Sequence, residues 1–197
     1  MTTARPYHHG NLRSALLRQA ELVLDERGTE GLSLRELARD VGVSNGAPRR
    51  HFADKGALLD ALAEEGFERL GRRLDTALDD SDGDFAERLA VFARTYVAFG
   101  VEHRALLGLM HRPKSEAPDD RLRAANDRAF AAPLRLLAEA RARGDIDPDT
   151  GGRADMTLLA LLQGLTVLAA TGMHGERPLD ELVTGTVTTL LNGLRPR

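Results

Sequence analysis

The chain has 197 residues, and 42% of them are hydrophobic, which is ordinary for a globular protein with one large or two modest domains. It contains no cysteine, which excludes disulfides, thiolate metal sites and cysteine nucleophiles and favours a reducing, cytoplasmic location. The formal net charge of -3 excludes a general attraction to nucleic acid, so any such binding must come from a local cationic patch.

The hydrophobic residues recur about every 3.6 positions along nearly the whole chain, and no alternating β-branched run is long enough for a strand. The sequence therefore predicts an all-α protein. A first helix is expected over residues 11–27. A second, short helix is expected after Ser33, because Ser33-Leu34-Arg35-Glu36 has the order of a capping box. It must end by Gly42, which can adopt a left-handed backbone.

Two short helices joined by a tight glycine turn are typical of a helix-turn-helix motif. Ser44 is placed to cap the helix that follows the turn. Gly46 and Pro48 lie near the start of that helix and keep its outer surface low, so that it can enter a groove of DNA. Ala38 is small enough for the two helices to approach closely.

Cationic side chains gather at the end of this motif. Arg49, Arg50 and His51 cannot all point inward, because Phe52 is needed in the core, so two of them face solvent or a polyanion. Lys55 lies near the start of the next helix, where its ammonium and the backbone donors can meet the same phosphate. Lysine and arginine barely outnumber aspartate and glutamate in this part of the chain. The prediction therefore depends on where the cations lie.

Longer helices are expected in the rest of the chain. The first runs from Asp54 to about Asp79. The next begins with a capping arrangement at Asp84–Glu87, and its aromatic residues repeat at helical spacing, which predicts a buried face. A short helix over residues 105–111, a polar loop up to Asp120 and a helix over residues 120–143 bent at Pro133 follow.

Residues 156–173 carry no charge and are about as long as the shortest membrane-spanning helices. Gln163, three threonines and two glycines dilute the apolar character of this segment. We therefore expect a buried helix of a soluble domain and no membrane partner. A last helix is expected over residues 179–194.

The segment SLRELARDVGVSNGAPRRHFADKGALLDAL, residues 33–62, resembles the DNA-binding region of the tetracycline-repressor (TetR) family of bacterial transcription regulators. The resemblance implies a three-helix DNA-binding head, residues 1–53, and a larger helical body, residues 54–197, for dimerisation and effector binding. It also implies a homodimer that binds a palindromic DNA operator and responds to a small molecule of unknown identity. No cofactor is expected.

The same resemblance assigns residue roles. It places Ser44, Asn45, Gly46 and Ala47 near base edges, and Arg49, His51 and Lys55 toward phosphates. Arg49 stands where relatives usually carry a phosphate-binding tyrosine, so it either replaces that contact or reaches a guanine edge. Two alternatives therefore stay open for Arg49. The full predicted DNA-binding set is Ser33, Ser44, Asn45, Gly46, Ala47, Arg49, Arg50, His51 and Lys55.

The body has two further candidate surfaces. A mostly apolar effector pocket with few polar anchors is predicted, although aromatics and methionines at helical spacing are also typical of an ordinary core. Its candidates are Phe92, Tyr96, Phe99, Met110, Phe130 and Gln163. A dimer interface is predicted on the last two helices, where two small residues four apart permit close approach; packing within one subunit is the alternative. Its candidates are Ala160, Gly164, Leu179, Val183, Val187 and Leu190.

The main rival interpretations are an all-α small-molecule-binding protein or enzyme without a DNA role, and a helical adaptor for other proteins. The sequence has no HExxH or CxxC spacing and no glycine-rich phosphate loop after a strand. No catalytic or metal-binding residue is therefore predicted. Salt-dependent DNA binding would separate the regulator from the adaptor, and turnover of a substrate would favour the enzyme.

Overall fold

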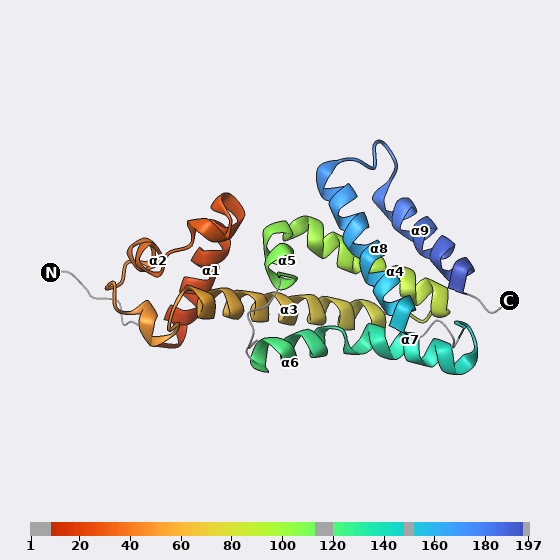
Figure 1. Ribbon diagram of the computed structural model, residues 1–197, viewed down its shortest axis with the longest axis horizontal. Helices are drawn as coiled ribbons and strands as arrows, with labels where there is room; N and C mark the ends of the chain where they lie inside the picture. The colour runs from red at the N-terminus through yellow and green to blue at the C-terminus, as the bar shows by residue number, and fades with distance from the viewer. Residues whose placement is uncertain (1–8, 113–119, 148–151, 195–197) are drawn as a thin grey trace. The chain divides into compact units, whose positions relative to one another are not determined.

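The structure is a computed structural model that describes residues 9–112, 120–147 and 152–194. Within these ranges it contains helices and no strand, which confirms the all-α prediction (Figure 1). The predicted polar loop falls largely on residues 113–119, outside the described residues. The described α-helices are α1 (His9–Arg27), α2 (Leu34–Val41), α3 (Lys55–Asp79), α4 (Phe85–Glu102), α5 (Arg104–Met110), α6 (Asp120–Ala129), α7 (Ala131–Arg143), α8 (Gly152–Thr171) and α9 (Leu179–Leu194).

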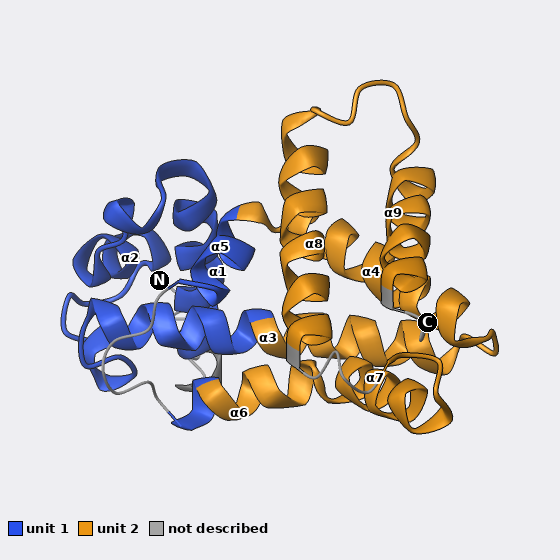
Figure 2. Ribbon diagram, turned by 45° about the vertical axis from the view of Figure 1, so that its right-hand side comes forward, with its two compact units in different colours: residues 1–66, 105–122 blue, residues 67–104, 123–197 orange. Residues whose placement is uncertain are grey.

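The chain divides into two compact units, which Figure 2 distinguishes by colour. Unit 1 comprises residues 1–66 and 105–122, and unit 2 comprises residues 67–104 and 123–197. The helix α3 belongs to unit 1 up to Gly66 and to unit 2 from Phe67 onward. The predicted boundary between residues 53 and 54 instead coincides with the start of α3, and it stays a prediction.

Unit 1 is built around the packing of α1 on α2 and of α2 on a 3-10 turn at Pro48–Arg50. The core side chains are aliphatic apart from Phe52, which is 2% exposed. Asp54 caps α3, because its carboxylate accepts a hydrogen bond from the Ala57 N–H at 2.8 Å. In the same unit, a Cβ at Gly66 would lie 2.7 Å from the Met110 sulfur, so glycine there lets α5 pack on α3.

Unit 2 is centred on α4, against which α7, α8 and α9 pack. Asp84 and Glu87 form the predicted capping box, with N–H···O distances of 3.0 and 2.9 Å. Phe92, Tyr96 and Phe99 are buried on α4, which confirms the predicted aromatic face. Burial of these large rings removes much apolar surface from water and stabilises the unit.

The predicted single helix over residues 120–143 is wrong, because the structure has two helices separated at Phe130. Pro133 lacks an N–H and its ring would clash with the Ala129 carbonyl, so α6 ends at Ala129 and Pro133 falls in the first turn of α7. Helix α6 thus ends four residues before the proline. The α7 helix then ends at Gly144, which is left-handed with φ 82°.

Helix α8 is long and apolar enough to cross a membrane by length and composition, and 28% of the window Arg153–Thr171 is buried in this chain. The same properties are found in core helices of soluble proteins. One face of α8, with Leu158, Leu162 and Leu165, packs inside unit 2, while Met156 and Val167 are exposed. The predicted buried helix is therefore buried on one face only within this chain.

Candidate nucleic-acid interface

The glycine turn of the predicted motif forms as expected. Gly42 ends α2 in the left-handed conformation, with φ 76° and ψ 34°. The Val43 N–H then donates to the Ala38 carbonyl at 2.8 Å, which closes the end of the helix. Ala38 is fully buried where α2 meets the rest of the unit. Gly42 therefore sets the backbone direction after α2, because residues other than glycine rarely adopt a positive φ.

The segment after the turn differs from the prediction. A helix starting near Ser44 was expected, but the structure has only the 3-10 turn Pro48–Arg50. The Ser44 carbonyl accepts from the Ala47 N–H at 2.9 Å, in an i to i+3 turn. Pro48 cannot donate the i to i+4 bond that an α-helix would require of it, and Gly46 has a low helix propensity. These two residues account for the tighter, shorter geometry.

An open pocket with a volume of about 790 Å³, called the concave surface below, lies between the start of α2, the segment after the turn and the start of α3. It brings together five of the nine predicted residues, namely Ser33, Asn45, Gly46, Arg49 and Lys55. Ser44, Ala47, Arg50 and His51 do not line it. Arg35 does line it and was missed from the sequence. The sequence feature that could have indicated Arg35 is its position in the first turn of a short helix, two residues after Ser33.

The cations on this surface have no partner among the described residues. Arg35, Arg49 and Lys55 make no ion pair there, and neither does the neighbouring Arg50. Asp54 also lines the surface, but its carboxylate is engaged at the start of α3. The surface therefore presents several N–H donors and an excess of positive charge to solvent, which suits phosphate oxygens.

Several other arginines of unit 1 are paired within the chain, although Arg18 on α1 is not paired with any described residue. Arg13 lies 3.9 Å from Glu64, and Arg39 lies 3.5 Å from Asp40. Arg13 also stacks 5.6 Å from the centroid of the Phe52 ring, which fixes it against the core. The concave surface therefore gathers three cationic groups that have no ion pair with the described residues, whereas Arg13 and Arg39 are engaged within the chain.

The predicted capping box at the start of α2 is not formed. Ser33 occupies the N-cap position, but its hydroxyl accepts no hydrogen bond from the helix. Glu36 instead lies 3.6 Å from Arg27, so its carboxylate is drawn away from the Ser33 backbone. Ser33 lines the concave surface, and its hydroxyl is not used to cap α2.

The predicted effector residues fall in two places. Tyr96 has ring contacts at 6.3 Å with both Phe92 and Phe130, and the Gln163 amide donates to its hydroxyl oxygen at 2.9 Å. Burial raises the pKa of Tyr96 well above its usual value, an effect only partly offset by the Gln163 hydrogen bond. Met110 belongs to unit 1.

Phe99, the sixth of these residues, is buried beside two polar groups. The His103 ring centroid lies 4.8 Å from its own, and the Arg73 guanidinium lies 5.5 Å from it. Arg73 also donates to both Glu102 oxygens, at 2.6 and 3.0 Å. These hydrogen bonds raise the pKa of Arg73 and hold the pKa of Glu102 below its usual value. All six effector assignments stay predictions.

The predicted dimer residues are split between buried and exposed positions. Val183 and Val187 are each 1% exposed within the single chain, while Ala160 and Gly164 are exposed and Leu179 and Leu190 are half-buried. A Cβ at Gly164 would meet no atom within 4 Å. The interface stays a prediction, with the exposed side of α8 as the part that a second chain can reach.

Two family models match the chain. The model described as "Bacterial regulatory proteins, tetR family" matches residues 16–62, which include the concave surface. The model described as "Tetracyclin repressor-like, C-terminal domain" matches residues 89–190. The two matches cover the glycine turn as well as most of α4 to α9.

Individual proteins are also similar. A solved structure described as a protein with unknown function from Rhodococcus sp. RHA1 is 42% identical with a TM-score of 0.85, and the match covers 98% of this chain and 100% of that one. The tetracycline repressor protein class C of Escherichia coli is 37% identical over 123 residues, 61% of this chain and 56% of its own. The HTH-type transcriptional regulator Mb1846 of Mycobacterium bovis is 30% identical over 125 residues, 61% of this chain and 53% of its own. This chain thus spans about half the length of these curated relatives.

Proposed function

Because the chain belongs to the TetR family of bacterial regulatory proteins, we propose that it is a DNA-binding transcriptional regulator, a ligand-responsive repressor that binds a palindromic operator as a homodimer. The observation that carries the proposal is the concave surface of unit 1, with its unpaired cations and exposed polar side chains. Within this proposal the protein acts in the cytoplasm and catalyses no reaction.

Each part of the concave surface has a role in the proposal. Asn45 and Ser44 follow the glycine turn on an exposed segment of small residues, so their side chains can approach base edges. Arg49 and Lys55 bind phosphates, and Arg35 adds a third phosphate contact that the sequence did not suggest. Phosphate contacts fix the position of the protein on the duplex, and the base contacts provide the sequence preference.

The test is a selection of duplexes from random DNA by the purified protein, followed by titration of the selected duplex at two salt concentrations. We expect a palindromic sequence, and we expect the Arg49→Ala, Arg50→Ala variant to bind it more weakly. Each lost phosphate contact makes the negative slope of log K against log salt shallower by about 0.9. The Arg135→Ala variant is the control, because it removes an exposed arginine of unit 2 that lies 4.0 Å from Glu139. No enriched sequence, or equal weakening in the control, would contradict the proposal.

Dimerisation through the exposed side of α8 has a separate test. Gly164 has open space around it, so Gly164→Arg leaves the single chain undisturbed and inserts a bulky charge into the proposed interface. We expect this variant to be monomeric by analytical ultracentrifugation with an unchanged helical circular dichroism spectrum. Gly108→Arg, at an equally open glycine of α5, serves as the control and is expected to remain dimeric. A dimeric Gly164→Arg protein would place the interface elsewhere.

Ligand response in the proposal is a linkage effect. Helix α3 runs from the concave surface of unit 1 into unit 2 as one continuous helix, so a change in its position concerns both units. A ligand that binds more tightly to a conformation with poor operator geometry lowers DNA affinity by that difference in affinity. The Tyr96–Gln163 pair is the polar anchor that we propose for such a ligand.

A further inference from the structure

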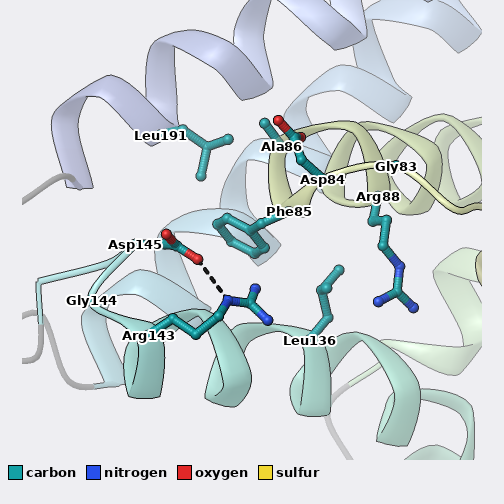
Figure 3. A pocket seen from close by; sticks show the side chains of 10 residues that line it. All are labelled: Gly83, Asp84, Phe85, Ala86, Arg88, Leu136, Arg143, Gly144, Asp145 and Leu191. Atoms are coloured by element: carbon teal, nitrogen blue, oxygen red, sulfur yellow. Dashed lines mark hydrogen bonds and ion pairs between the residues drawn. The ribbon is translucent and has the colours of Figure 1, made fainter.

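A cavity of unit 2, of about 670 Å³, is lined by none of the predicted effector residues. It is bounded by the start of α4, the end of α7 and one residue of α9. In Figure 3 the side chains of Phe85, Leu136 and Leu191 point toward one another across the cavity, with Arg143 on one side of them and Arg88 on the other. The cavity therefore combines an apolar interior with two guanidinium groups.

The apolar part of the cavity is built from three helices. Leu136 is 3% exposed and Leu191 is 7% exposed, so both form a firm floor that is already packed. The Phe85 ring is only half-buried, although it is the first residue of α4 and a large aromatic group. A ligand chain lying on this ring would remove apolar surface from water at little structural cost.

Arg88 is the unusual polar group. Its side chain is half-buried, and its Nε is fully buried without a hydrogen-bond acceptor. Among the described residues, no carboxylate lies within the ion-pair distance of 4.0 Å of its guanidinium. Buried donors in folded proteins are nearly always paired, and a buried charge without a counter-ion is costly. Arg88 therefore lines the cavity with a charge that has no counter-ion among the described residues and is available to a bound anion.

The other charged groups of the cavity are already engaged. The Arg143 Nε donates to the Asp145 carboxylate at 3.0 Å. The Asp84 carboxylate accepts the Glu87 N–H at 3.0 Å, so the start of α4 is occupied by its own cap. Arg88 is thus the cation of the cavity that lacks a partner among the described residues, which makes one anionic group on the ligand sufficient.

We propose that this cavity binds an amphiphilic monocarboxylate, with the carboxylate on Arg88 and the apolar chain on Phe85. A carboxylate suits the site because its two oxygens match the planar fork of a guanidinium, and the resulting hydrogen bonds are charge-assisted. The site is distinct from the predicted effector residues, which begin one turn further along α4 at Phe92. Ligand binding at this site does not depend on the proposed function. Only an effect of the ligand on DNA binding would depend on it.

The probe is octanoate, titrated into the full-length protein by isothermal titration calorimetry, with octanamide as its uncharged counterpart. We expect octanoate to bind, and we expect octanamide to bind at least about tenfold more weakly, because the charge-assisted hydrogen bonds to Arg88 are lost. Equal binding of the two compounds, or no binding of octanoate, would overturn the proposal.

Arg88→Met tests the residue itself, because methionine keeps the length of the side chain and removes the buried Nε. We expect about tenfold weaker octanoate binding than in the wild type, together with a thermal midpoint that is unchanged or raised in the absence of ligand. Arg135→Met, a matched change on α7 at an exposed position, should bind octanoate as the wild type does. Undiminished binding by Arg88→Met would refute the assignment.

Two further measurements separate folding and DNA effects from the site. Phe85→Leu keeps an apolar residue and shortens the contact, so we expect octanoate affinity to fall by a smaller factor than in Arg88→Met. A fall larger than that of Arg88→Met would count against the charge as the main determinant. Operator binding with and without octanoate is then compared: octanoate binding by a protein that selects no DNA sequence would support this site and contradict the proposed function.

Discussion

The guanidinium groups of Arg49 in unit 1 and Arg73 in unit 2 differ in whether they are paired within the chain. Arg73 donates to both oxygens of Glu102, at 2.6 and 3.0 Å, and lies 5.5 Å from the Phe99 ring centroid. Arg49 is exposed and makes no ion pair with the described residues. An arginine paired within its chain contributes to local structure, whereas one with vacant donors is available to an external anion. Arg49 is therefore available to an external anion and Arg73 is not, although the body also contains Arg88, which has no partner among the described residues.

The N-caps of the two units show the same difference. Asp84 accepts a hydrogen bond from the α4 backbone and completes a capping box, so its side chain is used in folding. Ser33 holds the equivalent position on α2 without any side-chain hydrogen bond to the helix. Both residues have the same sequence signature, namely a cap residue followed three positions later by glutamate. The structure separates a cap whose side chain stabilises its helix from one whose side chain does not and which lines the concave surface.

The largest effect that this comparison predicts is on stability in unit 2. Phe99→Ala removes a fully buried ring and leaves a cavity, so we expect the free energy of unfolding to fall by about 3–5 kcal/mol in urea melts. Arg49→Ala should change it by less than about 0.5 kcal/mol, because surface substitutions without partners rarely matter for stability. A destabilisation of Arg49→Ala approaching that of Phe99→Ala would show that Arg49 has a structural role.

The two caps give a smaller, paired prediction. Asp84→Ala should cost about 1 kcal/mol of stability, since it removes the acceptor of the Glu87 N–H. Ser33→Ala should cost close to nothing in the free protein but should weaken binding to the selected operator. Thermal melts and operator titrations of both variants check this. If Ser33→Ala proved as destabilising as Asp84→Ala, the proposed difference between the caps would be lost.

The smallest effect concerns the Arg73–Glu102 pair at acid pH. The pKa of Glu102 is lowered in the folded chain, chiefly by hydrogen bonds from Arg73, so its contribution to stability is present above the unfolded value of about 4.3. That contribution is lost as the pH falls through the lower, folded pKa. The difference in urea midpoint between wild type and Glu102→Gln should therefore shrink below about pH 4. Because the pair is exposed, the difference is small even at pH 7, and a difference that grew on acidification would contradict this account.

Much of the fold could be predicted from local patterns. The Asp84 capping box, the left-handed Gly42 and the buried aromatic face of α4 each depend on residues within a turn or two of one another, and each was predicted correctly. The errors have local causes as well. Pro48 was expected near the start of a helix, but the backbone there forms a 3-10 turn. Pro133 was expected to bend one long helix, but the chain forms two helices, with Pro133 in the first turn of the second.

The candidate interface was predictable in part. The cluster after Gly42 indicated cationic groups near the turn, and the structure gathers Asn45, Arg49 and Lys55 on one concave surface. Arg35 was missed, because its place in the first turn of a short helix is only a weak signal. Its closeness to these residues depends on how α2 packs against the segment that follows it.

The sequence by itself determined the helical composition, the glycine turn and the placement of a dense cationic segment beside it, since these follow from periodicity and backbone preference. Only the tertiary structure decided which cations have partners. Ion pairs such as that of Arg73 and Glu102 join residues far apart in the chain, and the vacancy at Arg88 is defined by the absence of any described carboxylate from α7 or α9 near it. Pairing depends on distances between helices, which local sequence does not encode, and that is why the cavity at Arg88 has no signature in the sequence.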